Sequence, residues 1–320
     1  MAIFSFWRSF FGVCQLDSPV RSARTLNARQ LDGRLLGAAF LSVAVLAGCA
    51  SLDVKQGQWI FNPSERGWGG TSQATMGMQD AWIDFDSALT GQSVKLHALV
   101  HPAGNASAPV LLYLHGARWD VSGSAHRIAR MQELGFTVVA VDYRGFGKTS
   151  KETPSEKMAY EDAQATWQWI AKTYPSQPRY IFGHSLGGAI AIELARNVQD
   201  EQGTIVEGTF TSIPDVASTM AWGWLPTGAL ITQRFESVKK IASIGSPLLV
   251  VHGASDSIIK PHLGRKLFEA AAEPKRFVLV DGGSHHNTNA VGQSAYKIAL
   301  AELFGHVPTP LAIKTSLSVK

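Results

Sequence analysis

The sequence predicts an α/β fold in which helices cover both faces of a mostly parallel sheet. Three observations predict it. Short apolar runs alternate with longer helical patterns along most of the chain. The run at residues 110–114 is apolar without interruption, which is typical of a strand buried on both faces. A serine flanked by glycines separates a strand pattern from an Ala/Ile/Leu-rich helical pattern within residues 179–196. The 320 residues, 45% of them hydrophobic, suffice for one such core.

An antiparallel pair of strands is predicted to begin the sheet. Residues 81–85 and 94–100 alternate between apolar and polar side chains, and Thr90-Gly91 supplies the turn between them. The later strands are expected at 110–114, 137–141, 180–182, 205–209, 248–251 and 277–280. The helices are expected at 125–134, 155–172, 186–196, 261–272 and 290–303. Because such sheets bind ligands at the carboxyl ends of their strands, the loops that follow the strands should carry the functional residues.

Before the sheet, residues 35–48 form an uninterrupted apolar run that Arg34 precedes. The run is too short for a comfortable membrane span and suits the hydrophobic region of a signal peptide. The sequence LAGC at residues 46–49 resembles a bacterial lipobox, which implies that Cys49 is diacylated and becomes the mature N-terminus. A buried helix that ends at Gly48 is the alternative, but polar, glycine-rich sequence follows at once.

Four parts of the chain are therefore expected. They are a signal peptide over 1–48, a tether over 49–79 that starts from the lipidated cysteine, the α/β domain over 80–306 and a C-terminal tail over 307–320. Trp59, Ile60, Phe61 and Pro63 interrupt the polar tether, and we expect them to dock on the domain; contact with lipid or with a ligand is the less favoured alternative. Ala50 follows the cysteine, which in lipoproteins of this type implies the outer membrane. We thus expect a lipid-anchored protein of the cell envelope that faces the periplasm.

The charge distribution argues against a nucleic-acid partner, and the cysteine count argues against an intramolecular disulfide. The net charge is +4, and residues 1–48 hold five arginines against two aspartates, so the remainder carries only +1. Lysine and arginine do not cluster along that remainder, so nothing indicates a nucleic-acid partner. Cys14 lies in the segment that would be removed, and an acylated Cys49 would be the only cysteine left. No intramolecular disulfide is then expected.

The sequence Gly183-His184-Ser185-Leu186-Gly187 occupies the predicted turn from strand to helix. A serine on so sharp a turn is held in a strained backbone conformation, and the positions two before and two after it must be nearly free of side chain. Glycine at both positions meets that requirement. The turn also places the serine at a helix N-terminus, whose N–H groups and dipole favour developing negative charge. We interpret Ser185 as a nucleophile rather than part of an ordinary glycine-rich turn.

An acyl-transfer nucleophile needs two N–H donors that bind the oxyanion. The fitting pair is Leu186, which follows the nucleophile, and Ala117, in the loop after an earlier strand. Asp256 follows another strand end, where a carboxylate can hold the Nδ1–H of a histidine. Asp142 is its rival, but it precedes Ser185, whereas the order in this fold class is serine, acid, histidine. We therefore assign Asp142 a structural role.

His285 and His286 follow the last predicted strand. Adjacent side chains cannot both reach one hydroxyl, so only one of them is the general base. Neighbouring histidines rarely chelate one metal ion, and the sequence has neither a His-Glu-x-x-His motif nor clustered Cys/His spacing. We expect neither a metal nor an organic cofactor.

Residues from about 81 to 304 resemble the α/β-hydrolase superfamily, because LYLHGAR, VDYRGFGKTS, GHSLGG, LLVVHGASD and GGSHHN occur in the expected order. They look most like a small-lid branch that includes bacterial hydrolase lipoproteins, monoacylglycerol-lipase-like enzymes and thioesterases that remove palmitate from proteins. In loops that resemble GGSHHN, a small residue precedes the catalytic histidine and a polar residue follows it. The resemblance therefore implies that His285, between Ser284 and His286, is the base.

The expected lid, at about 212–246, is short. Its Trp222, Trp224 and Leu225 either line an acyl pocket or pack the lid on the body, and the sequence favours neither.

The sequence as a whole predicts a membrane-anchored serine hydrolase that cleaves a lipid-like acyl ester or thioester with Ser185, His285 and Asp256. One alternative is an aminopeptidase or amidase of the same fold. It would need an acidic pocket for the substrate amine, and the lid offers only Asp215 and Glu236. Another is a non-catalytic surface lipoprotein in which these three residues are idle.

Overall fold

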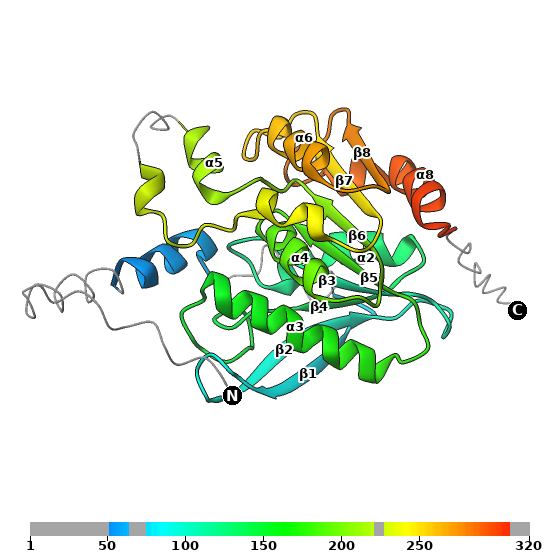
Figure 1. Cartoon of the computed structure of the whole chain (residues 1–320). Helices are drawn as coiled ribbons and strands as arrows, with labels where there is room; N and C mark the ends of the chain where they lie inside the picture. Colours follow the sequence, from blue (N-terminus) through cyan, green and yellow to red (C-terminus); the bar gives the residue numbers. More distant parts are fainter. Residues whose placement is uncertain (1–50, 64–74, 221–226, 308–320) are drawn as a thin grey trace, which may run out of the picture. The chain divides into compact units, whose positions relative to one another are not determined.

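The computed structural model describes residues 51–63, 75–220 and 227–307. Eight strands form one sheet in the order β1-β2-β4-β3-β5-β6-β7-β8 (Figure 1). They are β1 Gln79–Asp86, β2 Ser93–His101, β3 Val110–Leu114, β4 Thr137–Val141, β5 Arg179–His184, β6 Glu201–Glu207, β7 Leu248–Gly253 and β8 Lys275–Val280. β2 pairs antiparallel with β1 and β4, and all the later pairings are parallel. The predicted α/β fold with a mostly parallel sheet is confirmed.

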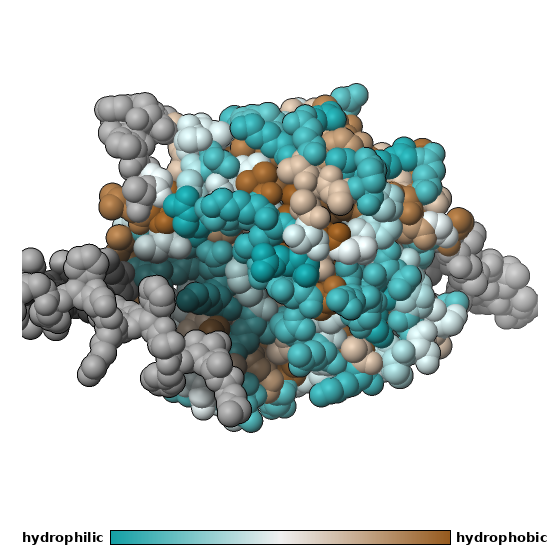
Figure 2. Space-filling view, viewed as in Figure 1, coloured by the Kyte–Doolittle hydropathy of each residue, from teal (hydrophilic) through white to brown (hydrophobic). Residues whose placement is uncertain are grey.

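Helices cover both faces of this sheet, because alternate side chains of its strands enter two separate cores. The helices are α2 Ala125–Glu133, α3 Glu156–Thr173, α4 Leu186–Asn197, α5 Ile213–Ser218, α6 Pro261–Ala270, α7 Thr288–Val291 and α8 Gln293–Phe304. Leu112 packs in the core shared with α3, α4 and α6, whereas Leu111 and Tyr113 pack with α2 and α8. The outer side of the face that carries α3 is mostly hydrophilic (Figure 2). Within the described ranges, no helix combines the length and hydropathy that a bilayer crossing requires.

The largest differences from the predicted bounds occur at two elements. β6 begins at Glu201, four residues before the predicted start. Its first residues pair with β5, but they are polar or glycine and so gave no apolar pattern from which a strand could be predicted. The helix predicted over 290–303 is divided into α7 and α8 at Gly292. A Cβ on Gly292 would lie 2.9 Å from the Thr288 carbonyl oxygen and 2.9 Å from the Val280 side chain. The close approach to β8 therefore requires glycine, and the helix breaks at that residue.

Residues 51–61 form a helix where the composition predicts a tether. Its last residue, Phe61, is fully buried and makes edge-on contacts with Tyr143, Phe146 and Phe235. Gln56 fixes the helix to the lid segment, since its Nε2 donates to the Leu230 carbonyl and its Oε1 accepts from the Thr232 N–H. Trp59, Ile60 and Phe61 thus belong to a helix that is packed on the domain, and Pro63 follows it.

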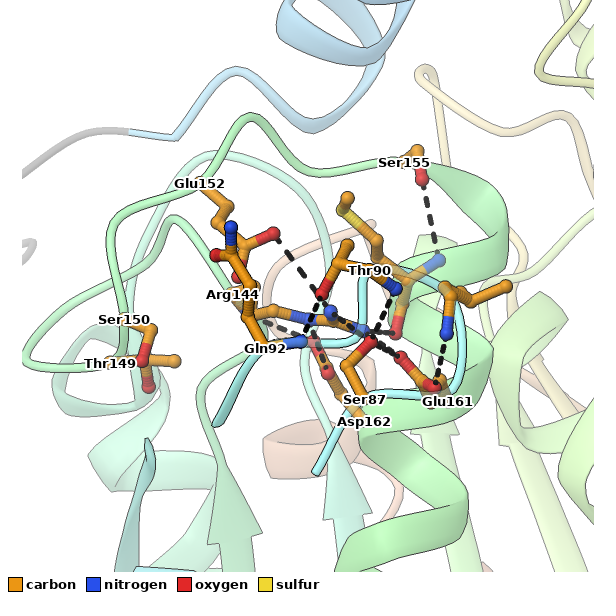
Figure 3. Close-up of polar contacts among 12 residues, drawn as sticks. Ser87, Thr90, Gln92, Arg144, Thr149, Ser150, Glu152, Ser155, Glu161 and Asp162 are labelled. Carbon is orange, nitrogen blue, oxygen red and sulfur yellow. Dashed lines mark hydrogen bonds and ion pairs between the residues drawn. The ribbon is translucent and has the colours of Figure 1, made fainter. Parts of the chain in front are cut away.

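A buried arginine secures the loop after β4. Arg144 is fully buried, and its Nε donates to Asp162 on α3 at 2.8 Å. Its guanidinium also donates to Glu161 of α3 and to Ser87 in the β1–β2 turn (Figure 3). Two carboxylates and a hydroxyl satisfy the buried charge, so this network joins the antiparallel hairpin to the parallel part of the sheet.

In the described part of the expected lid, the chain forms only short helical turns. Besides α5 these are η2 Thr227–Leu230, η3 Ser237–Lys239 and η4 Ile241–Ser243.

Candidate active site

Ser185 stands on a strained turn between β5 and α4. Its backbone has φ 56° and ψ −121°, a region that residues other than glycine rarely adopt. A Cβ on Gly183 would lie 2.2 Å from the Gly187 carbonyl oxygen, and one on Gly187 would lie 2.1 Å from the Leu114 carbonyl oxygen. The Ser185 N–H donates to the Glu207 carbonyl at 2.9 Å. The turn therefore requires both glycines, and β6 holds it in place.

A chain of hydrogen bonds joins Ser185 to His285 and Asp256. His285 Nε2 lies 3.0 Å from Ser185 Oγ, and His285 Nδ1 lies 2.8 Å from Asp256 Oδ2. The three residues follow β5, β8 and β7, whose carboxyl ends meet at one edge of the sheet. His285 and Asp256 are buried. The structure thus brings together three residues that span 100 positions of the chain, in a geometry that suits a nucleophile, a base and an orienting acid.

The surroundings of Asp256 keep its carboxyl ionised. Burial would raise its pKa, but hydrogen bonds from His252 and His285 and from the Ile259 N–H outweigh burial, and the pKa lies well below its usual value. The Ile258 and Ile259 N–H groups donate to Asp256 Oδ1 at 2.9 and 2.8 Å. A carboxylate held in this way can orient a histidine and stabilise its imidazolium form.

His184 supports the loop that carries the base. Its Nε2 lies 3.0 Å from the His285 carbonyl oxygen. Burial, reinforced by the charges of Arg127 and His285, holds the pKa of His184 well below its usual value. The ring is therefore neutral and donates its Nε2–H to that carbonyl, which fixes the backbone of the base.

The sequence predicts that the backbone N–H groups of Ala117 and Leu186 form an oxyanion site next to Ser185. In the described part of the chain, no acceptor is hydrogen-bonded to the N–H of Ala117 or Leu186. A Cβ on Gly116 would lie only 3.1 Å from Ser185 Cβ, so the loop that carries Ala117 closely approaches the nucleophile. The next N–H of that loop, from Arg118, donates to the Phe61 carbonyl at 2.8 Å. The segment over 51–63 therefore holds this loop.

His286 is oriented differently from its neighbour His285. Its ring is nearly perpendicular to that of His285, at 83°, and lies 6.1 Å from the Trp119 ring. Arg127 Nη2 donates to its backbone carbonyl. Burial and the charges of His285 and Arg127 lower the pKa of His286. His285 alone of the two reaches Ser185, which agrees with the predicted loop register.

Asp142, for which the sequence predicts a structural role, contacts residues other than the predicted base. Asp142 accepts from the Val121 N–H and lies 3.1 Å from His97 Nδ1, and its carboxyl does not contact His285. His115 is buried and its Nδ1 lies 2.7 Å from the Gly116 carbonyl oxygen.

A cavity of about 350 Å³ opens beside Ser185 and His285. Trp59, Ile60 and Asn62, from the segment predicted as a tether, line one side of it, and Ile258 contributes from the loop after β7. The sequence offered ligand contact for Trp59 and Ile60 only as the less favoured alternative to docking, and it gave no role to Asn62 or Ile258. The apolar residues 59–61 within polar sequence indicated that this segment docks on the domain, but they did not indicate that it docks beside Ser185.

Some of the predicted residues cannot be compared with the structure. Trp222, Trp224 and Leu225, the predicted pocket residues of the lid, lie outside the described residues, as does Cys49. Within the described ranges, no group of three or more His, Cys, Asp or Glu side chains is arranged to hold a metal ion.

The side of α2 that faces the cavity was also missed. The cavity is lined by His126, Arg127 and Arg130 of α2 and by Ser124, which precedes the helix, so this wall of the cavity is basic. The sequence predicted the helix but carried no indication of which of its faces points at the serine.

Comparison with known proteins gives a family and a fold. A family model described as serine aminopeptidase, S33, matches residues 105–237. An uncharacterized protein of Mycobacterium tuberculosis is 37% identical over 190 residues, which cover 58% of this chain and 66% of that protein. The lysophosphatidylserine lipase of Danio rerio is 35% identical over 190 residues, which cover 53% of this chain and 49% of the lipase. The chain thus spans about half the length of the lipase it matches.

Solved structures share the fold at low sequence identity. An esterase of Pyrococcus furiosus has a TM-score of 0.62 at 19% identity and covers 77% of this chain and 99% of its own. A puromycin-hydrolyzing peptidase of Mycobacterium tuberculosis has a TM-score of 0.57 at 18% identity, over 74% of this chain and 41% of its own. An α/β hydrolase from Penicillium has a TM-score of 0.55 at 16% identity, over 72% of this chain and 99% of its own.

Proposed function

This chain belongs to the α/β-hydrolase superfamily, and on that premise we propose that it is a serine hydrolase that cleaves carboxylic esters or thioesters through an acyl-enzyme. The observation that carries the proposal is the continuous chain of hydrogen bonds from Asp256 through His285 to Ser185 Oγ. The strained turn at Ser185 and the two unengaged N–H groups of Ala117 and Leu186 support it, because each costs stability that a merely structural serine would not require.

The chemistry then follows from the positions of the atoms. His285 Nε2 takes the proton of Ser185 Oγ as the oxygen bonds to the carbonyl carbon of the substrate. The N–H groups of Ala117 and Leu186 stabilise the oxyanion that forms. Collapse of this intermediate breaks the bond to the alcohol or thiol, which leaves with the proton from His285. Water, deprotonated by the same histidine, then attacks the acyl-enzyme and releases the acid.

An ester is the favoured substrate, although the matching family model is described as a serine aminopeptidase. The esterase fold neighbour and the relationship to a lysophosphatidylserine lipase both support it. A peptidase of the alternative kind must bind the ammonium group of a substrate N-terminus. Among the described residues that line the cavity, none is acidic, and three are arginines. The cavity wall therefore disfavours that group.

The location belongs to the same proposal. We place the protein in the cell envelope, anchored through a lipidated Cys49 and facing the periplasm, on the support of the short apolar run and the LAGC sequence.

Covalent labelling with a fluorophosphonate tests the function, because that reagent reports a serine activated by its base and its oxyanion site together. Wild-type protein from residue 50 onward should be labelled and should hydrolyse 4-nitrophenyl esters. Ser185→Ala should be folded, unlabelled and inactive. Hydrolysis that persists in the folded Ser185→Ala variant would show that the nucleophile is elsewhere. A folded wild-type protein that is neither labelled nor active on esters, thioesters or aminoacyl amides would favour the non-catalytic alternative.

A further inference from the structure

The cavity beside Ser185 is basic. Three arginines line it, Arg118, Arg127 and Arg130, together with His126 and His286. No aspartate or glutamate stands among the described residues of its wall. Because the walls of a cleft focus the field of the charges that line it, such a cavity favours an anion and disfavours a cation.

Helix α2 supplies most of this charge from one face. His126 and Arg130 are four residues apart, so they lie one above the other on the helix, and Arg127 lies beside them. The side chain of Arg127 is fixed by a salt bridge. Its Nε donates to the buried Glu207 at 3.0 Å, and Glu207 also accepts from the Tyr296 hydroxyl. Glu207 thus offsets the charge of Arg127 and fixes its side chain at the cavity wall.

Arg130 has no such partner. Its side chain is partly buried at the cavity, and within the described ranges no acceptor or carboxylate bonds its guanidinium. A guanidinium carries five N–H donors in a planar fork that matches a carboxylate or a phosphate. The donors of Arg130 are therefore available to a ligand in the same cavity as Ser185 Oγ.

We propose that the substrate is an acyl ester that carries an anionic group, a phosphate or a carboxylate, and that Arg130 binds this group with support from Arg127. The inference rests on the proposed ester hydrolysis and adds the charge of the substrate to it. The apolar part of the substrate lies against Trp59 and Ile258, which line the same cavity. Arg130 is a specificity residue in this scheme, because it contacts the anion rather than the reacting carbonyl.

Two pairs of esters test the proposal. The first is mono-4-nitrophenyl glutarate and its neutral methyl ester. The second is hexanoylglycerol 3-phosphate and uncharged monohexanoylglycerol. For at least one pair, wild-type kcat/KM should be about tenfold higher for the anionic member, the scale of a hydrogen bond to a charged group. Preference in the phosphate pair alone points to a lipid headgroup, and preference in the carboxylate pair alone points to a dicarboxylic acid monoester.

Arg130→Gln should remove most of this preference, chiefly by lowering kcat/KM on the anionic member, and Arg130→Lys should restore part of it. Arg196→Gln is the matched control, since Arg196 is an exposed arginine in the last turn of α4, at the opposite end of that helix from Ser185. It removes the same charge and should leave the preference unchanged. Higher ionic strength should weaken the wild-type preference.

Failure of this inference differs from failure of the proposed function. If wild type hydrolyses both members of each pair equally, or prefers the neutral ones, the anionic subsite is wrong and the esterase stands. The subsite is also wrong if folded Arg130→Gln loses activity equally on both members, because that would be a structural effect. If no ester is cleaved and no fluorophosphonate is bound, both proposals fall.

Discussion

The helix over residues 51–61 is predicted to be part of the catalytic apparatus, which Phe61→Ala tests. Phe61 is fully buried, and its carbonyl accepts the Arg118 N–H at 2.8 Å. That bond fixes the loop that carries Ala117, whose N–H is one of the two proposed oxyanion donors. Removing the Phe61 ring leaves a cavity beneath the segment, so the carbonyl should lose its position and the loop should loosen.

The expected magnitudes follow from burial and from oxyanion binding. Truncation of a buried phenylalanine to alanine costs about 3–5 kcal/mol of unfolding free energy. Complete loss of one oxyanion donor costs about 100- to 1,000-fold in kcat. Because Phe61→Ala displaces the loop without deleting its donor, we expect kcat/KM to fall by about tenfold.

Phe136→Ala is the matched control. Phe136 is equally buried, but it lies in the other core against Tyr180 and His306. Both variants should lose similar stability in urea unfolding. Only Phe61→Ala should lose activity on a short-chain 4-nitrophenyl ester, measured where both proteins are folded. Equal kcat/KM in the two folded variants would refute the reasoning. Phe61→Leu, which removes less volume, provides the same comparison if the alanine variant does not fold.

Three further predictions concern other residues. His285→Ala should lower the acylation rate by several orders of magnitude, whereas His286→Ala should keep most of it; stopped-flow fluorophosphonate labelling measures both, and the reverse order would show a loop register misread by one residue. Cys49→Ser should abolish acylation and processing in the native host, as mass spectrometry of the mature N-terminus would show; an unlipidated mature protein that begins elsewhere would contradict it. The folded state should lose stability below about pH 6.5, because burial lowers the pKa of His184 and His115. In the unfolded chain these two histidines bind protons below that pH, whereas in the folded protein they stay neutral until their lower pKa values are reached. The unfolding free energy should therefore fall by up to about 1.4 kcal/mol per pH unit for each histidine. Urea unfolding at pH 7.5, 6.0 and 5.0 measures this loss, and an unfolding free energy that does not change with pH would contradict the prediction.

The sheet and the positions of the chemical groups could be predicted because their signals are local. Uninterrupted apolar runs mark the buried strands, and the two glycines around Ser185 mark a turn that nothing larger fits. Once the strands are parallel, their carboxyl ends share one edge. Asp256 and His285 lie in two loops far from Ser185 in the sequence, and both loops follow strands that end at this edge. Their proximity to Ser185 could therefore be predicted without knowledge of any contact.

The walls of the cavity could not be predicted in the same way. The helix over 51–61 is attached to the lid by hydrogen bonds between the Gln56 side chain and the backbone of Leu230 and Thr232. Such bonds leave no periodic pattern in the sequence. The role of Arg130 depends on which face of α2 points at Ser185, and that is set by the packing of Ile128 and Met131 against the sheet. Tertiary packing decides both features.

The helix that lines the cavity lies near the proposed anchor in the sequence. Ten positions separate Trp59 from Cys49, and a chain of that length spans at most about 35 Å even when fully extended. Trp59 lines the cavity and is 72% exposed. An acylated Cys49 would therefore keep the cavity close to the bilayer surface. Because an amphiphilic ester partitions into that surface with its charged group in the headgroup region, such an anchor and the basic wall of α2 would both act on the same class of substrate.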